Sequence, residues 1–167
     1  GRYPADCSLW GRPELGFAAT ATQSADEKYI SCANSRVDRV GSMSDLGLYQ
    51  LRRWREYKIL SAFDVSFWVS PAVVRTALQY LGCFHAEAGK ISPLEFYERA
   101  VHYKPTVIFG EPSWIVRLTE IAEKRGTWGL KFMFAGGVNI AEDTRREVER
   151  VWNASFHLDY GQTEAFG

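Results

Sequence analysis

Cysteine is scarce in this sequence: the 167 residues contain only three, Cys7, Cys32 and Cys83, far apart along the chain. None belongs to a CxxC pair, so the sequence indicates neither a disulfide framework nor a paired-cysteine zinc motif. Net charge is also absent, because 20 basic residues balance 20 acidic ones. That balance argues against a positive electrostatic field around the protein that would attract nucleic acid or an anionic membrane. No apolar run is long enough for a signal peptide or a membrane-spanning helix, so we expect a cytoplasmic protein without nucleic-acid or membrane partners.

The composition is that of a globular protein with a hydrophobic core. Hydrophobic residues make up 46% of the chain and charged residues 24%, and this length is sufficient for one domain of ordinary size. The chain begins at Gly1 without a methionine and ends shortly after Glu164. We therefore expect it to be a piece of a longer protein.

The first third of the chain shows little periodicity. Residues 1–27 carry scattered glycine, proline and small polar residues and are expected to be irregular. A short strand is expected at 29–33, and a helix at 44–57, where Leu48, Leu51 and Trp54 recur at three-residue spacing. We expect a domain organisation in which an N-terminal segment, residues 1–57, precedes a βαβ nucleotide-binding core at residues 58–167.

The remainder alternates regularly between apolar strand patterns and amphipathic helix patterns. Strands are expected at 58–63, 83–86, 106–109, 131–134 and 155–159. Helices are expected from Ser70, after Ser92, from Ser113 and from Ala141, with serine capping the free amides of the first three. Ser92 and Glu95 have the spacing of a capping box. This alternation predicts an α/β fold with a mostly parallel sheet and flanking helices from successive βαβ units.

Three loops at strand ends carry the residues best suited to chemistry, at 109–113, 135–139 and 159–164. Ligands of open parallel sheets bind in such loops. Gly136 and Gly137 let backbone approach a flat ligand, although a plain turn needs the same residues. Tyr160 could stack on a base, and Thr163 could donate to a phosphate oxygen. Glu164 could hold a magnesium ion, the alternative being a solvated glutamate in a turn.

Residues 105–164 resemble the adenylate-forming superfamily, and most of all the phenylacetate–CoA ligases. The likeness lies in the order Pro-Thr-Val-Ile-Phe-Gly-Glu-Pro-Ser-Trp, then Gly-Gly after a strand, then Tyr-Gly-Gln-Thr-Glu. Residues 58–104 match more loosely. The resemblance implies part of the N-terminal domain of such an enzyme. It also implies a reaction in which ATP activates a carboxylic acid as an acyl adenylate and the acyl group passes to coenzyme A.

The resemblance also assigns site residues. Those implied to bind the nucleotide are Gly136, Gly137, Val138, Asp159, Tyr160, Gly161 and Gln162. Thr163 and Glu164 are implied to be catalytic, Thr163 at a phosphate and Glu164 as the ligand of Mg2+. The acid pocket is expected to involve Phe63, Phe67 and Trp68, for which ordinary core packing is the alternative. The implied cofactors are ATP, Mg2+ and coenzyme A, and the implied substrate is a small carboxylic acid.

Two departures from the family pattern leave a second function open. The family has an acidic residue or alanine and then proline after Gly-Gly, whereas this chain has Val138 and Asn139. Residues 31–40, where the phosphate loop is expected, contain no glycine, and such a loop cannot easily wrap its amides around pyrophosphate. The alternative is a degenerate, non-catalytic member that serves as a binding or interaction module. The family's C-terminal domain is an expected partner of this piece. Without that domain, the piece alone is expected to be a poor ligase. A homodimer is left open.

Overall fold

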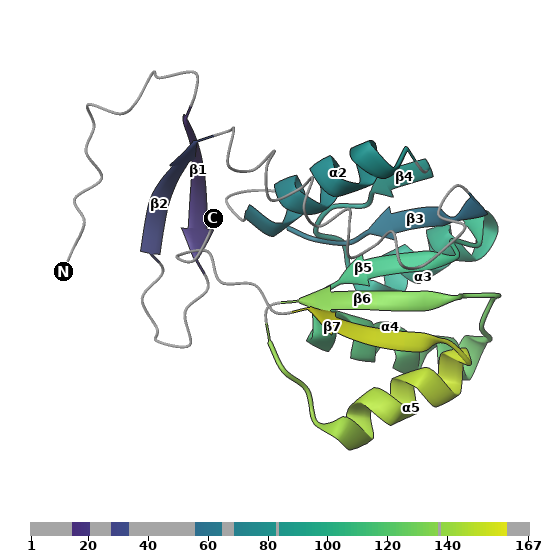
Figure 1. Ribbon diagram of the computed structural model, residues 1–167. Coiled ribbons are helices and arrows are strands. Elements are labelled where there is room, and N and C mark those ends of the chain that lie inside the picture. The colour runs from purple at the N-terminus through teal and green to yellow at the C-terminus, as the bar shows by residue number, and fades with distance from the viewer. Residues whose placement is uncertain are drawn as a thin grey trace. The chain divides into compact units, whose positions relative to one another are not determined.

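The computed structural model describes residues 15–20, 28–33, 56–64, 69–82, 84–136 and 138–159 (Figure 1). The described elements fall into two compact units. The first unit contains β1 (Leu15–Thr20), β2 (Lys28–Ala33) and α2 (Val69–Leu81). The second contains the remaining strands and helices, among them the strands that end at Gly136 and Asp159 of the predicted site. The predicted domain boundary after residue 57 stays a prediction.

In the first unit, β1 and β2 pair antiparallel, with Leu15 opposite Ala33 and Thr20 opposite Lys28. The predicted strand at 29–33 is confirmed, whereas the prediction that residues 1–27 are irregular is wrong at β1. The β1 sequence is rich in glycine and alanine, which have low strand propensity. Pairing with β2 overrides that propensity. The predicted helix at 44–57 lies almost entirely outside the described residues.

Helix α2 begins at Val69, one residue earlier than predicted. Ser70 therefore lies in the first turn instead of capping it, and Pro71 follows where a missing N–H costs no helical hydrogen bond. Ala77 and Leu78 of the helix are each 1% exposed and form its most buried side. The helix itself is therefore confirmed, while its boundary shifted by one residue.

The second unit is a five-stranded parallel sheet in the order β4-β3-β5-β6-β7. Its strands are β3 (Lys58–Ser61), β4 (Phe84–Glu87), β5 (Val107–Gly110), β6 (Phe132–Gly136) and β7 (Ser155–Asp159). Its helices are α3 (Pro93–Tyr103), α4 (Pro112–Arg125) and α5 (Glu142–Trp152). Each helix joins two parallel strands, so the predicted α/β class is confirmed.

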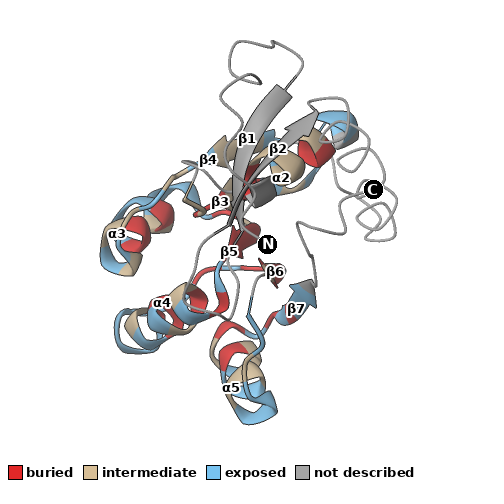
Figure 2. Ribbon diagram, turned by 90° about the vertical axis from the view of Figure 1, so that its left-hand side faces the viewer, coloured by how far each residue is buried: buried red, intermediate tan, exposed pale blue. Residues whose placement is uncertain are grey.

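Helices α3, α4 and α5 lie on one side of this sheet (Figure 2). Between them and the strands lies the core, in which Ile108, Met133 and Phe156 come from three neighbouring strands. Ile115 and Leu118 of α4 are both fully buried in the same cluster. All four residues of β5 are buried, as expected for the central strand of a parallel sheet.

The ends of these helices agree with the sequence signals in one case and differ in another. Ser92 caps α3, its Oγ accepting a hydrogen bond from the Glu95 amide at 3.1 Å, as predicted. The prediction that Ser113 caps α4 is wrong, because the helix begins at Pro112 and Glu111 is the cap residue, without a side-chain hydrogen bond. Proline at the first helical position fixes that earlier start.

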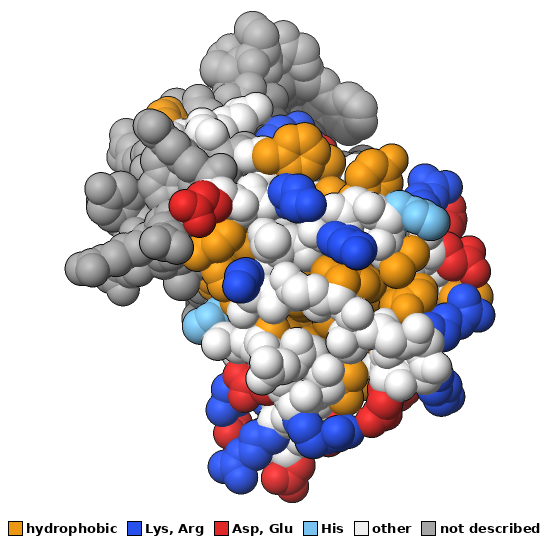
Figure 3. Space-filling view, turned by 90° about the vertical axis from the view of Figure 1, so that its right-hand side faces the viewer, with side chains coloured by type: hydrophobic (Ala, Val, Ile, Leu, Met, Phe, Trp, Pro, Cys, Tyr) orange, Lys and Arg blue, Asp and Glu red, His pale blue; other side chains and the backbone are white. Residues whose placement is uncertain are grey.

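Helix α5 is strongly amphipathic, with Val148 and Trp152 buried and charged residues outside. Its arginines pair with glutamates three or four residues away. Figure 3 shows the result at the bottom of the view, where basic and acidic side chains are intermingled. The charged side of this helix is therefore a surface joined by local ion pairs.

Candidate functional site

The candidate site lies at the carboxyl edge of the sheet, where β5, β6 and β7 end side by side. Gly110 of β5 is opposite Ala135 of β6, and Gly136 of β6 is opposite Asp159 of β7. The three loops singled out in the sequence therefore leave the sheet at the same edge from neighbouring strands. This is the arrangement in which open parallel sheets bind ligands.

Gly136 and Asp159 are two predicted site residues that the strand register places opposite each other. Gly136 is the last residue of β6, so it belongs to the strand and not to the predicted turn. It lacks a side chain, so the β6 backbone carries no Cβ at this position, beside the end of β7. Val138, two residues on, is an exposed apolar side chain at 67%.

Gly110 has a packing role instead. A Cβ atom there would lie 3.2 Å from Cε3 of Trp114 and 3.4 Å from Cγ1 of Ile115. The indole of Trp114 is held in place, because its Nε1 donates to the Ile91 carbonyl at 2.9 Å and its ring packs edge-on against Phe96. Glycine at position 110 therefore lets the first turn of α4 approach the end of β5.

Aromatic rings form a row across the sheet that the sequence analysis missed. Phe109 stacks on Phe134 with ring centroids 4.9 Å apart, and Phe134 stacks on His157 at 5.1 Å. The three residues occupy matching register positions in β5, β6 and β7. Phe109 is buried, Phe134 is half-buried and His157 is exposed, so the row becomes accessible toward β7. Only the strand register could have identified it, since the three residues are far apart in sequence.

The end of β3 contributes polar contacts. Ser61 Oγ and His85 Nε2 are 3.0 Å apart, but Ser61 is only 4% exposed. A buried hydroxyl satisfied by a neighbouring imidazole is a structural pair and not an accessible nucleophile. Beyond the strand, Asp64 accepts a hydrogen bond from Lys90 at 3.1 Å. This ion pair joins the segments that follow β3 and β4.

Phe63, expected in the acid pocket, is half-buried in the segment after β3. Its expected companions Phe67 and Trp68 lie outside the described residues, so the pocket stays a prediction. The same holds for Gly137, the Asp159 side chain and the motif at 160–164. The structure therefore places the strand ends that precede the nucleotide motif, and the contacts of the motif itself stay predicted.

Two features absent from the described residues bear on other classes of site. No group of three or more histidine, cysteine, aspartate or glutamate side chains is arranged to hold a metal ion within the ranges that the structure describes. Among the same residues, no helix is both long enough and apolar enough to cross a membrane.

No protein-family model matches the sequence, and no curated protein matches it. Solved structures match in fold. One is 2-hydroxyisobutyryl-CoA ligase in an open conformation with 2-HIB-AMP and CoA, at a TM-score of 0.78 and 15% identity; the match covers 92% of this chain and 37% of that one. The second is MatB from Rhodopseudomonas palustris, at a TM-score of 0.64 and 15% identity, covering 90% of this chain and 29% of that one.

A third match is the amide bond synthetase McbA from Marinactinospora thermotolerans, at a TM-score of 0.68 and 16% identity, covering 90% of this chain and 30% of that one. The chain thus spans about a third of the length of the solved structures that it matches. All three are adenylate-forming enzymes. This chain therefore has the fold of part of the acid–CoA ligases and their adenylate-forming relatives.

Proposed function

We propose that this chain is the nucleotide-binding piece of an acid–CoA ligase-like enzyme, which activates a small carboxylic acid with ATP and transfers the acyl group to coenzyme A. The observation that carries the proposal is the pairing of Gly136 with Asp159 at the carboxyl edge. It brings Gly136, the first of the two glycines, beside Asp159, the residue that directly precedes the Tyr160–Glu164 motif in the sequence. The shared fold with acid–CoA ligases supports the same reading.

The described residues fit the adenine end of ATP. A planar base can approach closely where Gly136 leaves the backbone bare, and the exposed Val138 offers an apolar surface to it. In the proposal Gly137 continues that surface, and Asp159 and Tyr160 contact the base. Gly161 and Gln162 carry the chain from the base toward the phosphates.

The phosphate end of the proposal depends on Thr163 and Glu164. Thr163 would donate a hydrogen bond to a phosphate oxygen, and Glu164 would hold Mg2+. When bound, Mg2+ supplies positive charge that offsets the charge of the leaving pyrophosphate. The role of these residues is to orient the phosphates of ATP and to offset their negative charge. No protein nucleophile is needed, because the carboxylate of the acid is itself the nucleophile.

The reaction balances without a covalent protein intermediate. A carboxylate oxygen bonds to the α-phosphorus while the bond to pyrophosphate breaks, which forms the acyl adenylate. The sulfur of coenzyme A, having lost its proton, then bonds to the acyl carbon, and AMP leaves. We propose Phe63, Phe67 and Trp68 as the aromatic wall of the acid pocket, which favours an apolar or aromatic acid.

A second function, a non-catalytic binding module with this fold, is favoured by one feature. Strand β2 ends at Ala33, and the following residues to position 40, where the phosphate loop is expected, contain no glycine. Without glycine, few backbone amides can converge on a phosphate chain. A module of this kind would keep the adenine end of the site and lack the phosphate end.

Pyrophosphate exchange in the longer protein separates the two functions. The enzyme is expected to exchange labelled pyrophosphate into ATP only when a suitable small acid is present, and Glu164→Ala should reduce that exchange by about two orders of magnitude or more. Glu111→Ala is the matched control, because Glu111 is an exposed carboxylate at the same sheet edge. ATP binding without exchange for any of a panel of aryl and alkyl acids would favour the binding module.

A further inference from the structure

Strand β7 is the last strand of the five-stranded sheet, so one of its edges has no neighbouring strand among the described residues. On the inner edge, the Ser155 N–H donates to the Lys131 carbonyl at 3.4 Å. Because successive N–H groups of a strand point to opposite edges, the Phe156 N–H points outward. An outward N–H of this kind is a template for pairing with another strand.

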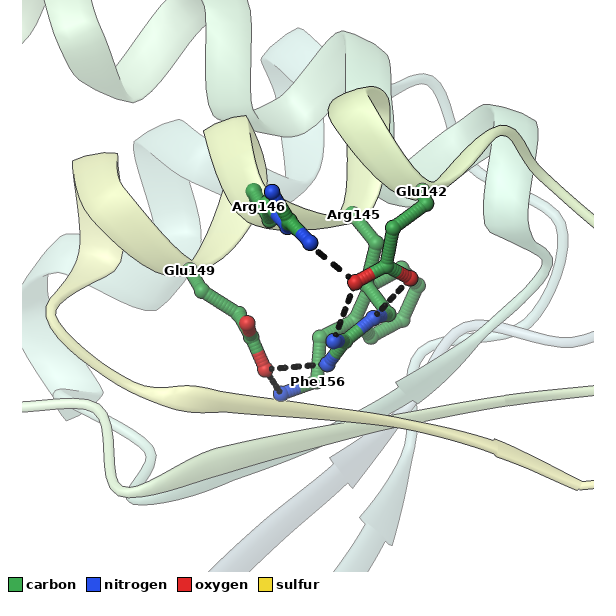
Figure 4. A network of polar contacts seen from close by, with 5 residues as sticks. All are labelled: Glu142, Arg145, Arg146, Glu149 and Phe156. Atoms are coloured by element: carbon green, nitrogen blue, oxygen red, sulfur yellow. Dashed lines mark hydrogen bonds and ion pairs between the residues drawn. The ribbon is translucent and has the colours of Figure 1, made fainter.

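Helix α5 supplies the partner for that outward N–H. The Phe156 N–H donates to Oε1 of Glu149 at 2.9 Å, and Nη1 of Arg145 donates to the same oxygen at 2.9 Å. Arg145 is itself anchored to Glu142 by hydrogen bonds of 2.7 and 2.8 Å. Figure 4 shows Glu149 reaching from the helix to the strand backbone beside this anchored guanidinium.

Glu149 differs from its exposed neighbour on the same helix. The side chains of Arg145 and Glu149 are 32% and 28% exposed, whereas those of Arg150 and Glu147 are 61% and 52% exposed. The Glu147 pair joins two side chains on the helix surface, but Glu149 also bonds to strand backbone. Its carboxylate is held from two sides in one position, at the edge of the sheet.

We propose that Glu149 closes the outer edge of β7 against strand addition, and that its removal opens this edge to the β7 strand of a second copy of the chain. The carboxylate accepts the hydrogen bond of the outward Phe156 N–H, so this group cannot pair with another strand. Its charge also repels the carbonyl oxygens of an incoming strand. A second copy is the fitting occupant, because two identical edges can pair about a twofold axis with the same residues on both sides. Leu158 of β7 is 38% exposed and would lose solvent contact there. Arg145 acts as a positioning residue, since it holds Glu149 without touching the strand amide.

The test compares four variants of the whole 167-residue chain: Glu149→Ala, Glu149→Gln, Glu147→Ala as the matched control, and Glu149→Ala combined with Leu158→Lys. At low concentration, the Phe156 amide of Glu149→Ala should exchange its hydrogen about tenfold faster than in wild type. At higher concentration, sedimentation should show that the average mass of Glu149→Ala rises above that of wild type, because two copies of the variant associate. Glu149→Gln keeps an acceptor oxygen but loses the charge, so its Phe156 amide should stay protected and it should associate less than Glu149→Ala. Glu147→Ala should behave as wild type.

The double variant distinguishes edge pairing from general loss of structure. A lysine on the edge strand opposes pairing, so Leu158→Lys should abolish the association of Glu149→Ala. The proposal is overturned if the Phe156 amide stays protected in Glu149→Ala at low concentration. It is equally overturned if this variant does not associate beyond wild type, or associates regardless of Leu158→Lys. These readouts do not involve ATP, so they stand or fall separately from the proposed enzyme function.

Discussion

At the scale of single residues, the glycines of the three loops have different reasons to be glycine. Gly136 is the last residue of β6, opposite Asp159 of β7, and its role at the nucleotide is proposed. Gly110 leaves room for Trp114, whose indole would lie 3.2 Å from an added Cβ. The packing reason is visible at Gly110, a distinction that their matching positions at the ends of two strands conceal.

Gly110→Ala should lower the free energy of unfolding by about 1–3 kcal/mol, because the added methyl group overpacks against an indole that cannot retreat. Trp114 is held by its hydrogen bond to the Ile91 carbonyl and by Phe96. Gly129→Ala is the control, since no atom lies within 4 Å of a Cβ there. Urea denaturation of both variants measures the difference. Equal stability of the two would mean that Trp114 moves freely and that the packing argument fails.

At the scale of elements, the sequence predicted the five strands of the sheet and its helices to within a few residues. It succeeded where a signal is local: the apolar run of β5, and the Ser92 cap of α3. It failed at β1, where pairing with β2 overrides low propensity. It could not find the row of Phe109, Phe134 and His157. Such a row depends on how strands are aligned, and no residue within one strand carries that information.

Helix α5 should be sensitive to acid through its ion pairs. A hydrogen bond from Arg145 is the largest influence on Glu142 and, with Arg146, lowers the pKa of its carboxyl to about 2 from an ordinary value of 4.5. A carboxyl whose folded pKa is lowered stabilises the fold fully above its unfolded pKa. That contribution is lost as pH falls from about 4.5 toward about 2.

Glu142→Gln should therefore flatten the fall of Tm between pH 4.5 and pH 2 relative to wild type. The difference should be small, because the Glu142 carboxylate lies at the surface, where water and salt screen the ion pair. Asp143→Asn, in the same helical turn, serves as the control for removing a negative charge near a helix start. Thermal melts monitored by circular dichroism across this range give the comparison. Identical profiles for Glu142→Gln and wild type would show that the pair contributes nothing to the fold.

At the scale of the whole molecule, the fold is better determined than the site. The α/β class follows from alternation along the sequence and is borne out by the parallel sheet. That one edge gathers the three loops follows from their places after parallel strands, and the structure adds that these strands, β5, β6 and β7, are neighbours. The contacts of Tyr160 to Glu164 depend on residues beyond the end of β7. They rest on the resemblance of the motif, and the function built on them is a proposal.

Calorimetric titration of this chain with ATP and Mg2+ tests the central claim most directly. If the carboxyl edge is a nucleotide site, the folded chain binds MgATP, and Glu164→Ala weakens binding by about tenfold or more while Glu111→Ala leaves it unchanged. Near-ultraviolet circular dichroism establishes that each sample is folded. A folded chain that binds no MgATP, or that binds it equally well with and without the Glu164 carboxylate, would contradict the account.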